Sequence, residues 1–312
     1  MLSQVTRTVA VLTHMGRPAA IDAATRLVEG LSAAGIVAAL PVDDLGQLDP
    51  RLAHAVKPLP KPIDEAHGIE LMVVLGGDGT ILRGAEWVLA SEIPLLGVNL
   101  GHIGFLAEAE SSEIDSIVQR IVDRSYTVEE RFTVEVKLRV CDSADTIWSS
   151  YAINEVSIEK ASRERMLEVL VEVDGRPLSR WACDGMLVAT PTGSTAYAFS
   201  AGGPVIWPEV DALLVVPLSA HALFARPLVL GPTSTVVVEV IDGSQTHGVV
   251  WCDGRRSIEL RTGMEIEVTR GRHRLRLARL SEAPFTDRLV NKFGLRIEGW
   301  RGAAEARNRI GL

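Results

Sequence analysis

The sequence is short of cysteine. Only three cysteines occur among 312 residues, Cys141, Cys183 and Cys252, and they lie far apart along the chain. Three widely spaced cysteines form neither a disulfide framework nor a CxxC metal pair. The seven histidines are scattered singly, so we do not expect a metal centre built from His and Cys. A protein of the reducing cytoplasm is the expectation.

Basic charge and long apolar runs are scarce too. Asp and Glu outnumber Lys and Arg by 40 to 32, giving a formal net charge of −8, and an acidic balance does not favour general nucleic-acid binding. The longest apolar stretches, such as Leu71–Leu75 and Ala212–Pro217, have the length of a strand, whereas a membrane-spanning helix needs roughly 20 residues. Met1–His14 also lacks the pattern of a secretory signal. We expect neither a nucleic acid nor a membrane as partner.

Apolar residues are plentiful, at 47% against 23% charged, which is typical of a globular protein with ample core. Short apolar runs alternate with helical patterns in the first part of the chain, which favours a parallel sheet with helices on both faces. The expected strands are Thr8–Thr13, Val37–Val42, Glu70–Leu75 and Pro94–Leu100. The expected helices are Ala19–Ala34, Ile81–Ala90 and a segment that Ser112 would cap, with Asp115 three residues on.

After Thr133 the hydrophobic period becomes two, as in an antiparallel sandwich or layered β domain. The alternating segments are Val134–Val140, Glu168–Val173, Thr235–Val240, Val249–Cys252, Glu265–Thr269 and Arg274–Leu280. Turn signals stand at Asp174-Gly175, Asp242-Gly243 and Asp253-Gly254. Helical spacing returns over Phe285–Phe293, and we expect that helix to pack back on the first domain. The predicted domains are 1–132 (α/β), 133–280 (all-β) and a returning segment 281–312.

The clearest motif is Gly76-Gly77-Asp78-Gly79-Thr80, which follows a buried strand and precedes a helix. We expect the three glycines to take positive φ and let backbone N–H groups approach phosphate oxygens, assisted by the positive end of the helix. Asp78 would repel phosphate, so it makes more sense as a group that accepts a hydroxyl proton or holds a metal ion. A tight turn with a capping aspartate is the plainer alternative, since loop motifs have false positives.

Two further clusters carry polar groups. Asp184-Gly185 is followed by Thr190–Tyr197 and Ser200–Pro204, a density of hydroxyls and glycines that suits a loop around a polar ligand. Tyr197 would lie against a flat base and Asp184 would accept hydrogen bonds. Asn154 and Glu155 are adjacent in what we predict as one alternating strand, Tyr151–Ile158. They would point to opposite faces of a regular strand and reach one ligand only at a bulge or a strand end.

Together these segments resemble the NAD kinase family. The matching motifs are Gly76–Thr80, Asn99–Leu106, Asn154-Glu155 and Asp184–Pro204, in the family's order. The glycine-aspartate motif alone also occurs in diacylglycerol and sphingosine kinases and in phosphofructokinases. The resemblance implies an N-terminal α/β domain with a C-terminal β domain, and transfer of a phosphoryl group from ATP, or from inorganic polyphosphate, to the 2′-hydroxyl of the adenosine ribose of NAD. It further implies Mg²⁺ or another divalent cation and a homo-oligomer, either a dimer or a tetramer.

The resemblance also implies roles for individual residues. Asp78 would be the general base. Gly76, Gly77, Gly79 and Thr80 would form the phosphate loop. The residues that would bind NAD are Asp78, Gly79, Arg83, Asn154, Glu155, Arg165, Asp184, Thr195, Ala196, Tyr197, Ala198, Phe199 and Ser200. Relatives often carry glutamine in place of Arg255, which leaves a contact between Arg255 and NAD open.

Two other functions stay open on the residues alone. A lipid kinase of the diacylglycerol type shares the glycine-aspartate loop but should carry an apolar acyl pocket, whereas Thr190–Gly203 is polar. A non-catalytic NAD(P) sensor would bind the dinucleotide without turnover. It would have no use for Asp78, because pure binding does not need a base beside phosphates.

Overall fold

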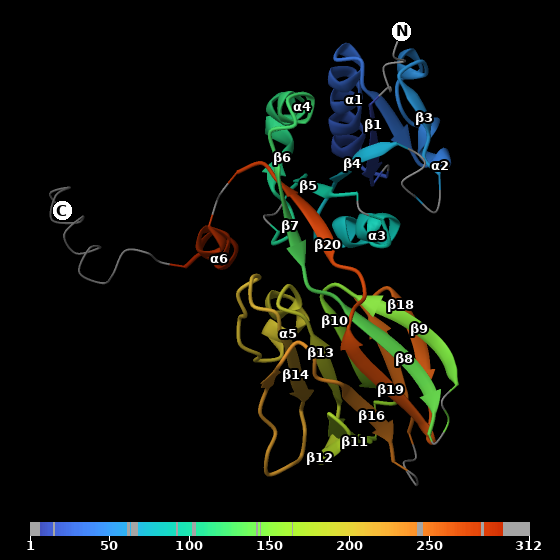
Figure 1. Ribbon diagram of the computed structural model, residues 1–312, viewed down its shortest axis with the longest axis vertical. Coiled ribbons are helices and arrows are strands. Elements are labelled where there is room, and N and C mark those ends of the chain that lie inside the picture. The colour runs from blue at the N-terminus through green and yellow to red at the C-terminus, as the bar shows by residue number, and fades with distance from the viewer. Residues whose placement is uncertain are drawn as a thin grey trace, which may run out of the picture.

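The computed structural model describes residues 7–14, 16–60, 63, 68–91, 93–101, 104–141, 143, 145–163, 165–241, 246–281 and 284–295. The turn predicted at Asp242-Gly243 and residues 296–312 of the predicted returning segment lie outside this part of the chain. The described residues fold into an α/β domain, called the first layer below, and a β sandwich, called the second layer (Figure 1), as the sequence predicted. The predicted limits at 132 and 280 stay predictions.

The first layer is an eight-stranded sheet with strand order β3-β2-β1-β4-β5-β20-β7, to which β6 adds beside β5. Its strands are β1 (Thr8–Thr13), β2 (Val37–Leu40), β3 (Val56–Pro58), β4 (Ile69–Leu75), β5 (Leu95–Asn99), β6 (Ala109–Glu110), β7 (Thr127–Arg131) and β20 (Leu275–Arg279). Its helices are α1 (Pro18–Ala33), α2 (Val42–Leu45), α3 (Asp78–Val88) and α4 (Ile114–Val122). All pairings are parallel except that of β7 with β20.

Helices cover both faces of this sheet. On one face α1 and α4 pack their apolar residues against β1 and β4, and on the other α3 packs against the alternate residues of the same strands. Because successive strand residues point to opposite faces, strands buried on both sides read as continuous apolar runs such as Leu71–Leu75. The parallel arrangement places the ends of β4 and β5 together at one edge, where the glycine-rich turn follows β4.

The second layer is a sandwich of two six-stranded antiparallel sheets. One has the order β15 (Leu228–Leu230), β14 (Leu213–Leu218), β13 (Gly185–Ala189), β10 (Glu155–Lys160), β17 (Gly248–Cys252), β18 (Arg256–Leu260). The other has the order β12 (Arg176–Cys183), β11 (Leu167–Val173), β16 (Val236–Val240), β19 (Met264–Arg270), β8 (Val134–Val140), β9 (Thr146–Ala152). A single apolar cluster, with Trp181 its largest fully buried side chain, fills the space between them.

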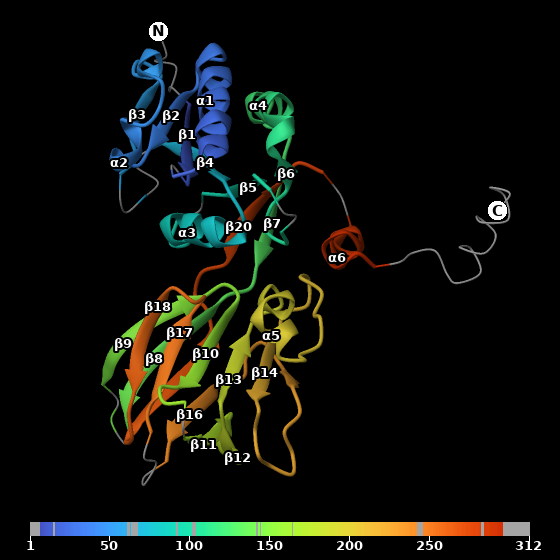
Figure 2. The ribbon, with the colours of Figure 1, turned by 180° about the vertical axis from the view of Figure 1, so that it is seen from behind.

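Two short segments and a last helix complete the fold. The segment α5 (Tyr197–Ser200) lies at the end of the sandwich that faces the first layer, as both ribbon views show (Figure 2). Helix α6 (Phe285–Phe293) ends at Gly294 in the left-handed conformation, φ 59°. The Arg288 side chain of α6 forms an ion pair with Glu108 of the first layer (N···O 2.7 Å). The predicted return of the C-terminal helix to the first domain is therefore confirmed.

Three local predictions differ from the structure. The strand predicted at Arg274–Leu280 belongs to the first sheet, where β20 pairs with β5 and β7. Ser112 does not cap a helix, because it lies inside a 3₁₀ turn, Ser111–Glu113, that Glu110 and Glu113 cap reciprocally. Tyr151–Ile158 is not one strand, since Ile153 and Asn154 separate β9 from β10, which lie in different sheets.

Candidate functional site

The glycine-rich turn connects β4 to α3. Gly77 is the N-cap of α3 with φ −84°, and none of Gly76, Gly77 and Gly79 has positive φ, so that expectation was wrong. Among these three glycines, only Gly76 is needed for space. A Cβ on Gly76 would lie 2.6 Å from the Cβ of Thr80, whereas Gly77 and Gly79 face open space. The N–H groups of Thr80 and Ile81 bond to the Gly77 carbonyl. The backbone N–H groups that precede them at the start of α3 have no intrahelical partner, so they are suited to binding an anion.

Asp78 is the first residue of α3, and a second loop fixes its carboxylate. Oδ2 accepts the backbone N–H of Phe105 (3.3 Å) and Oδ1 that of Leu106 (3.2 Å). A Cβ on Gly104 would lie only 2.1 Å from Oδ1, so the loop approaches this closely because residue 104 is glycine. The carboxylate is therefore held at the edge of the sheet where the turn presents its N–H groups.

Asn154 and Glu155 stand at a strand end, which is the case in which adjacent residues can serve one ligand. The Asp253 carboxylate, 100 residues away in the chain, accepts the N–H groups of Ile153 (3.0 Å) and Asn154 (2.7 Å). An ion pair with Arg256 (3.0 Å) balances its charge. Asp253 thereby sets the backbone between β9 and β10, and Glu155 begins β10.

The turn after β13 packs directly on this strand end. Thr190 donates its backbone N–H to the carbonyl of Asn154 (2.9 Å) and its hydroxyl to the carbonyl of Ile153 (2.6 Å). Gly193 touches the same backbone so closely that a Cβ would meet the Asn154 oxygen at 1.9 Å. Two motifs separated by some 35 residues in the sequence thus form one surface, which leads on into α5.

Glu155 is nearly buried, and its environment disfavours charge. Burial, followed by the nearby Asp253 carboxylate, raises the pKa of Glu155 to about 8, although the backbone N–H of Tyr197 acts in the opposite direction. Its Oε2 atom has no hydrogen-bond partner among the described residues. The raised pKa favours the neutral form of Glu155, which can donate as well as accept one hydrogen bond.

A cavity of about 470 Å³ lies beside α5 and gathers several of the predicted ligand-binding residues. Its lining includes Asp184, Tyr197 and Ser200, together with Lys160 and Ser219. Lys160 pairs with Asp184 (N···O 2.6 Å) and lowers the pKa of that carboxyl. Tyr197 is 40% exposed, so its ring is available to a ligand in the cavity.

Aromatic side chains of α6 connect the two parts of the site. The ring of Phe293 stacks on Phe199 of α5, with centroids 4.4 Å apart, and lies 5.7 Å from Phe105. Phe105 is the residue whose N–H holds Asp78, and Phe199 belongs to the segment predicted to bind NAD. The last helix thus contacts both the loop that positions Asp78 and the rim of the cavity.

Other predicted residues are placed elsewhere. Arg83 donates to the Thr13 carbonyl (2.6 Å), which holds its guanidinium near the end of β1. Arg165 is exposed ahead of β11 and makes no hydrogen bond or ion pair within the described part of the chain. The side chain of Ala198 is fully buried in an apolar cluster with Leu214 and Val216. Arg255 pairs with Glu86 of α3 (2.9 Å), a link between the two layers.

Sequence reasoning missed the residues that position this site. The sequence marks Asp253 only as a turn signal and Gly104 only as part of a family motif. The Asp-Gly turn is real, since Asp253 and Gly254 have φ 53° and 63°, but no local pattern shows that its carboxylate reaches the strand before Glu155. Such a contact becomes visible only when the strands are paired.

Side chains of the described residues form no ready-made site for a divalent cation. No three His, Cys, Asp or Glu side chains gather in a way that suits a metal ion among the residues described. The carboxylate of Asp78 is already engaged by two N–H groups. None of the three cysteines forms a disulfide within the described part of the chain, and burial raises the pKa of both Cys183 and Cys252 to about 11. Within the same residues, no helix is long and apolar enough to cross a bilayer.

The fold and the site define a two-domain kinase, with a glycine-rich turn and an acid at a helix start beside a β sandwich. The chain matches the ATP-NAD kinase N-terminal domain over residues 9–126 and the ATP-NAD kinase C-terminal domain over residues 153–280. It belongs to the NAD kinase family.

Individual relatives agree with this assignment. The chain is 53% identical to NAD kinase 2 of Streptomyces avermitilis, over 95% of this chain and 97% of that protein. It is 51% identical to the NAD kinase of Thermobifida fusca, over 97% and 94% respectively. Among solved structures, yeast NADH kinase complexed with NADH matches with a TM-score of 0.82 and 26% identity, over 94% of this chain and 89% of that one. An Archaeoglobus fulgidus NAD kinase in complex with ATP matches with a TM-score of 0.67 and 25% identity, over 92% and 97%.

Proposed function

We propose that this chain transfers the terminal phosphoryl group of ATP to the 2′-hydroxyl of the adenosine ribose of NAD, giving NADP and ADP. The observation that carries the proposal is the placement of Asp78. Its carboxylate is fixed by two N–H groups from the Gly104–Leu106 loop, at the start of a helix whose N–H groups suit phosphate. A hydroxyl and a phosphoryl group brought to this edge of the sheet would meet a base and anion donors together.

In the proposed reaction Asp78 acts as general base. A ribose hydroxyl is a weak acid, so a carboxylate in hydrogen-bond reach orients it and takes its proton while the new O–P bond forms and the bond to ADP breaks. Such assistance is typically worth about 10²–10⁴-fold. The transition state of phosphoryl transfer is loose, and its charge needs neutralising by positioned donors. The turn residues Gly76, Gly77, Gly79 and Thr80 are proposed to form the phosphate loop. Its backbone donors would be the N–H groups of Gly77 and Gly79, because those of Gly76 and Thr80 already bond to the carbonyls of Val98 and Gly77.

NAD is proposed to lie across the two domains. Asn154 and Glu155 at the strand end, Asp184 in the cavity and Thr195–Ser200 along its rim would hold the dinucleotide, with Tyr197 against a base. The neutral carboxyl of Glu155 supports this placement, because a group that donates and accepts suits a ribose or an amide.

Arg83 and Arg165 are kept as proposed contacts to phosphate or ribose, although each lies apart from the cavity. Mg²⁺ or another divalent cation would arrive on the phosphates of the donor, since the described side chains form no cage.

The decisive experiment is a coupled assay on the full chain. Purified protein is incubated with NAD, ATP and Mg²⁺, NADP is read by a dehydrogenase that requires it, and ³¹P NMR locates the new phosphate. We expect a 2′-phosphate on the adenosine ribose. Parallel reactions replace ATP by inorganic polyphosphate and NAD by NADH. Folded protein that binds NAD without forming NADP would favour a sensor, and phosphorylation of diacylglycerol without binding of NAD would favour a lipid kinase.

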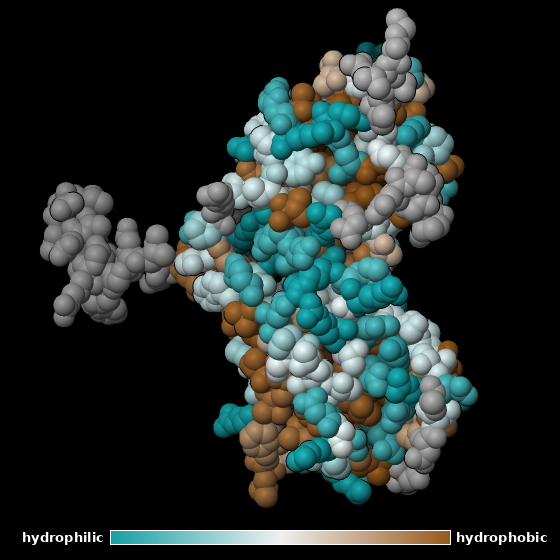
Figure 3. Space-filling view, viewed as in Figure 1, coloured by the Kyte–Doolittle hydropathy of each residue, from teal (hydrophilic) through white to brown (hydrophobic). Residues whose placement is uncertain are grey.

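We also propose that the chain works as a homo-oligomer, a dimer or a tetramer. Apolar side chains gather over the loop between β14 and β15 at the lower left of Figure 3. Leu223 and Phe224 in that loop are strongly exposed, and so is Val229 of β15. An exposed apolar patch of this kind is typical of an interaction surface. Light scattering after gel filtration measures the state, and Leu223→Asp is expected to shift it toward the monomer.

A further inference from the structure

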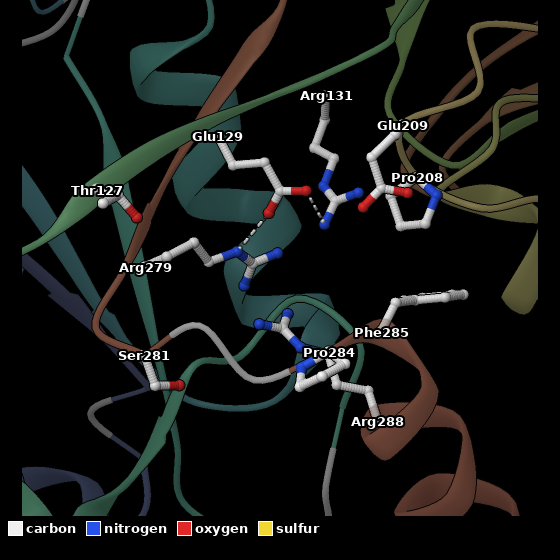
Figure 4. Close-up of a pocket in the computed structure, with 10 residues that line it drawn as sticks. All are labelled: Thr127, Glu129, Arg131, Pro208, Glu209, Arg279, Ser281, Pro284, Phe285 and Arg288. Carbon is white, nitrogen blue, oxygen red and sulfur yellow. Dashed lines mark hydrogen bonds and ion pairs between the residues drawn. The ribbon is translucent and has the colours of Figure 1, made fainter.

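A second cavity, of about 320 Å³, lies between the first layer, the loop after α5 and helix α6. Arginines from three separate elements line it: Arg131 at the end of β7, Arg279 at the end of β20 and Arg288 in α6. Figure 4 shows their guanidinium groups converging on the middle of the cavity. The cavity shares no lining residue with the one beside α5.

Carboxylates satisfy only part of this arginine cluster. Glu129 accepts from Arg131 (2.8 Å) and from Arg279 (2.7 Å), and Glu108 accepts from Arg279 (3.0 Å) and Arg288 (2.7 Å). The remaining donors Nε and Nη1 of Arg131 and Nη2 of Arg279 are buried without a partner in the described structure. Both arginines are only 5% exposed.

Buried donors without partners are costly, and charged ones most of all. The three guanidinium groups pair with two buried or half-buried carboxylates, Glu108 and Glu129. The second acid in the cavity lining, Glu209, is exposed. Burial, followed by the repulsion of Arg279, lowers the pKa of Arg131 to about 10. Arg131 therefore remains charged at pH 7, so three guanidinium charges stand against the two carboxylates that pair with them, and the exposed Glu209 is the remaining acid of the lining.

We propose that this cavity is a binding site for an inorganic oxyanion of the phosphate class. Planar guanidinium forks match the geometry of phosphate oxygens, and here three forks with buried free N–H donors surround one space. The volume admits a phosphate or a short chain of phosphates. A bound anion would satisfy the donors that the protein leaves unpaired.

The site adjoins the reaction centre without being part of it. Arg288 lies within 3.5 Å of the Phe105 carbonyl, and the N–H of the same Phe105 holds the Asp78 carboxylate. The ring of Phe285, another lining residue, is 6.0 Å from that of Phe105. An anion bound to Arg288 would therefore lie next to the loop that positions Asp78. The binding of that anion does not depend on the proposed reaction.

The test is direct binding. Inorganic phosphate and, separately, pyrophosphate are titrated into the full chain by calorimetry without NAD. Arg131→Lys keeps the positive charge beside Glu129 but removes the planar guanidinium. We expect this variant to bind phosphate about tenfold more weakly or worse, because one charge-assisted hydrogen bond to the anion is lost. Glu209→Gln removes a rim carboxylate that repels the anion and should tighten binding several-fold. The matched control Glu168→Gln, an exposed acid on β11, should leave affinity unchanged.

The source of the anion follows from repeating the titration in saturating ATP. Phosphate that binds as before identifies a site for free anion, and phosphate that is displaced identifies a site for the phosphates of the donor. Absence of saturable binding would overturn the proposal. So would binding that Arg131→Lys and Glu209→Gln leave equal to wild type, because the anion would then sit elsewhere, such as at the start of α3. Because Glu209 is exposed, its variant gives an answer even if Arg131→Lys unfolds.

Discussion

At the scale of single residues, the position of Asp78 depends on a residue that has no side chain. Asp78 Oδ1 occupies the space that a Cβ on Gly104 would fill, at 2.1 Å. The same loop supplies the N–H groups of Phe105 and Leu106. The orientation of the carboxylate is thus decided by how closely one backbone segment can approach another.

Gly104→Ala is therefore expected to lower activity more than stability. The added methyl group displaces the Asp78 carboxylate, which is the movable end of a side chain, so the fold survives with a loss of about 1–2 kcal/mol. A base moved by an ångström loses much of its catalytic effect. NADP formation and thermal unfolding would both be measured. Gly101→Ala is the matched control, because a Cβ there meets nothing within 4 Å. Equal activity in the two variants would contradict the role given to Gly104.

Glu155 makes stability depend on pH in an unusual direction. Its pKa is about 8 in the folded chain against an ordinary 4.5, so between these values the folded state binds more protons than the unfolded state. The free energy of unfolding therefore falls as pH rises from about 5 to about 8, by at most about 1.4 kcal/mol per unit. Glu155→Gln should remove this slope. Urea unfolding at pH 5, 7 and 8.5 measures it, with Glu168→Gln as control, and an unchanged slope in Glu155→Gln would contradict the assignment.

Sequence alone identifies residues such as Asp78 because their signal is local: a glycine-rich turn between a strand and a helix. It cannot identify the residues that hold them. Asp253 acts on Asn154 across about 100 positions, and Phe105 acts on Asp78 across 27. Those contacts arise from strand pairing and loop packing, which leave no periodic trace in the residues involved.

At the scale of elements, α6 is the part that joins the two halves of the site. The ring of Phe293 in α6 stacks on Phe199 of α5 and contacts Phe105, in the loop that holds the Asp78 carboxylate. Such aromatic pairs are each worth about 0.5–1.5 kcal/mol beyond burial. Leu289 is the one buried residue of this helix, so the rings contribute much of its attachment.

Phe293→Ala is expected to raise the KM for NAD several-fold, because Phe199 loses the support that holds its segment at the rim of the cavity. Steady-state kinetics at varied NAD, together with melting curves, would separate this effect from general destabilisation. Thr286→Ala, an exposed position on the same helix, is the control. A lower melting temperature with an unchanged KM would mean that α6 stabilises the fold without affecting the site.

The elements themselves were largely predictable where the pattern is long and regular. The alternation of strands and helices before residue 123 and the change to period two after 133 both reflect which faces are buried. Two failures share one cause. Strand β20 has the same alternation as the sandwich strands, yet it pairs with β5 and β7, and the break at Ile153 depends on Asp253. Which partner a strand takes is decided by the chain as a whole.

At the scale of the molecule, the two layers are tied together around the proposed reaction centre. Strand β20 carries the chain from the sandwich back into the first sheet. Glu86 of α3 pairs with Arg255 in the turn between β17 and β18 (2.9 Å) and lies 3.6 Å from Arg256 at the start of β18. The helix that begins with Asp78 is thus fixed to the domain that would hold NAD, as transfer to a bound hydroxyl requires.

The most direct measurement of the central claim is the kinetics of Asp78→Asn. The amide keeps the size of the carboxylate but cannot take a proton, so kcat for NADP formation should fall about 10²–10⁴-fold while the Kd for NAD stays close to that of wild type. Asp43→Asn, an exposed acid with the same change of charge, should match wild type in both. Near-normal turnover by Asp78→Asn, with folding intact, would contradict the assignment of Asp78 as the base.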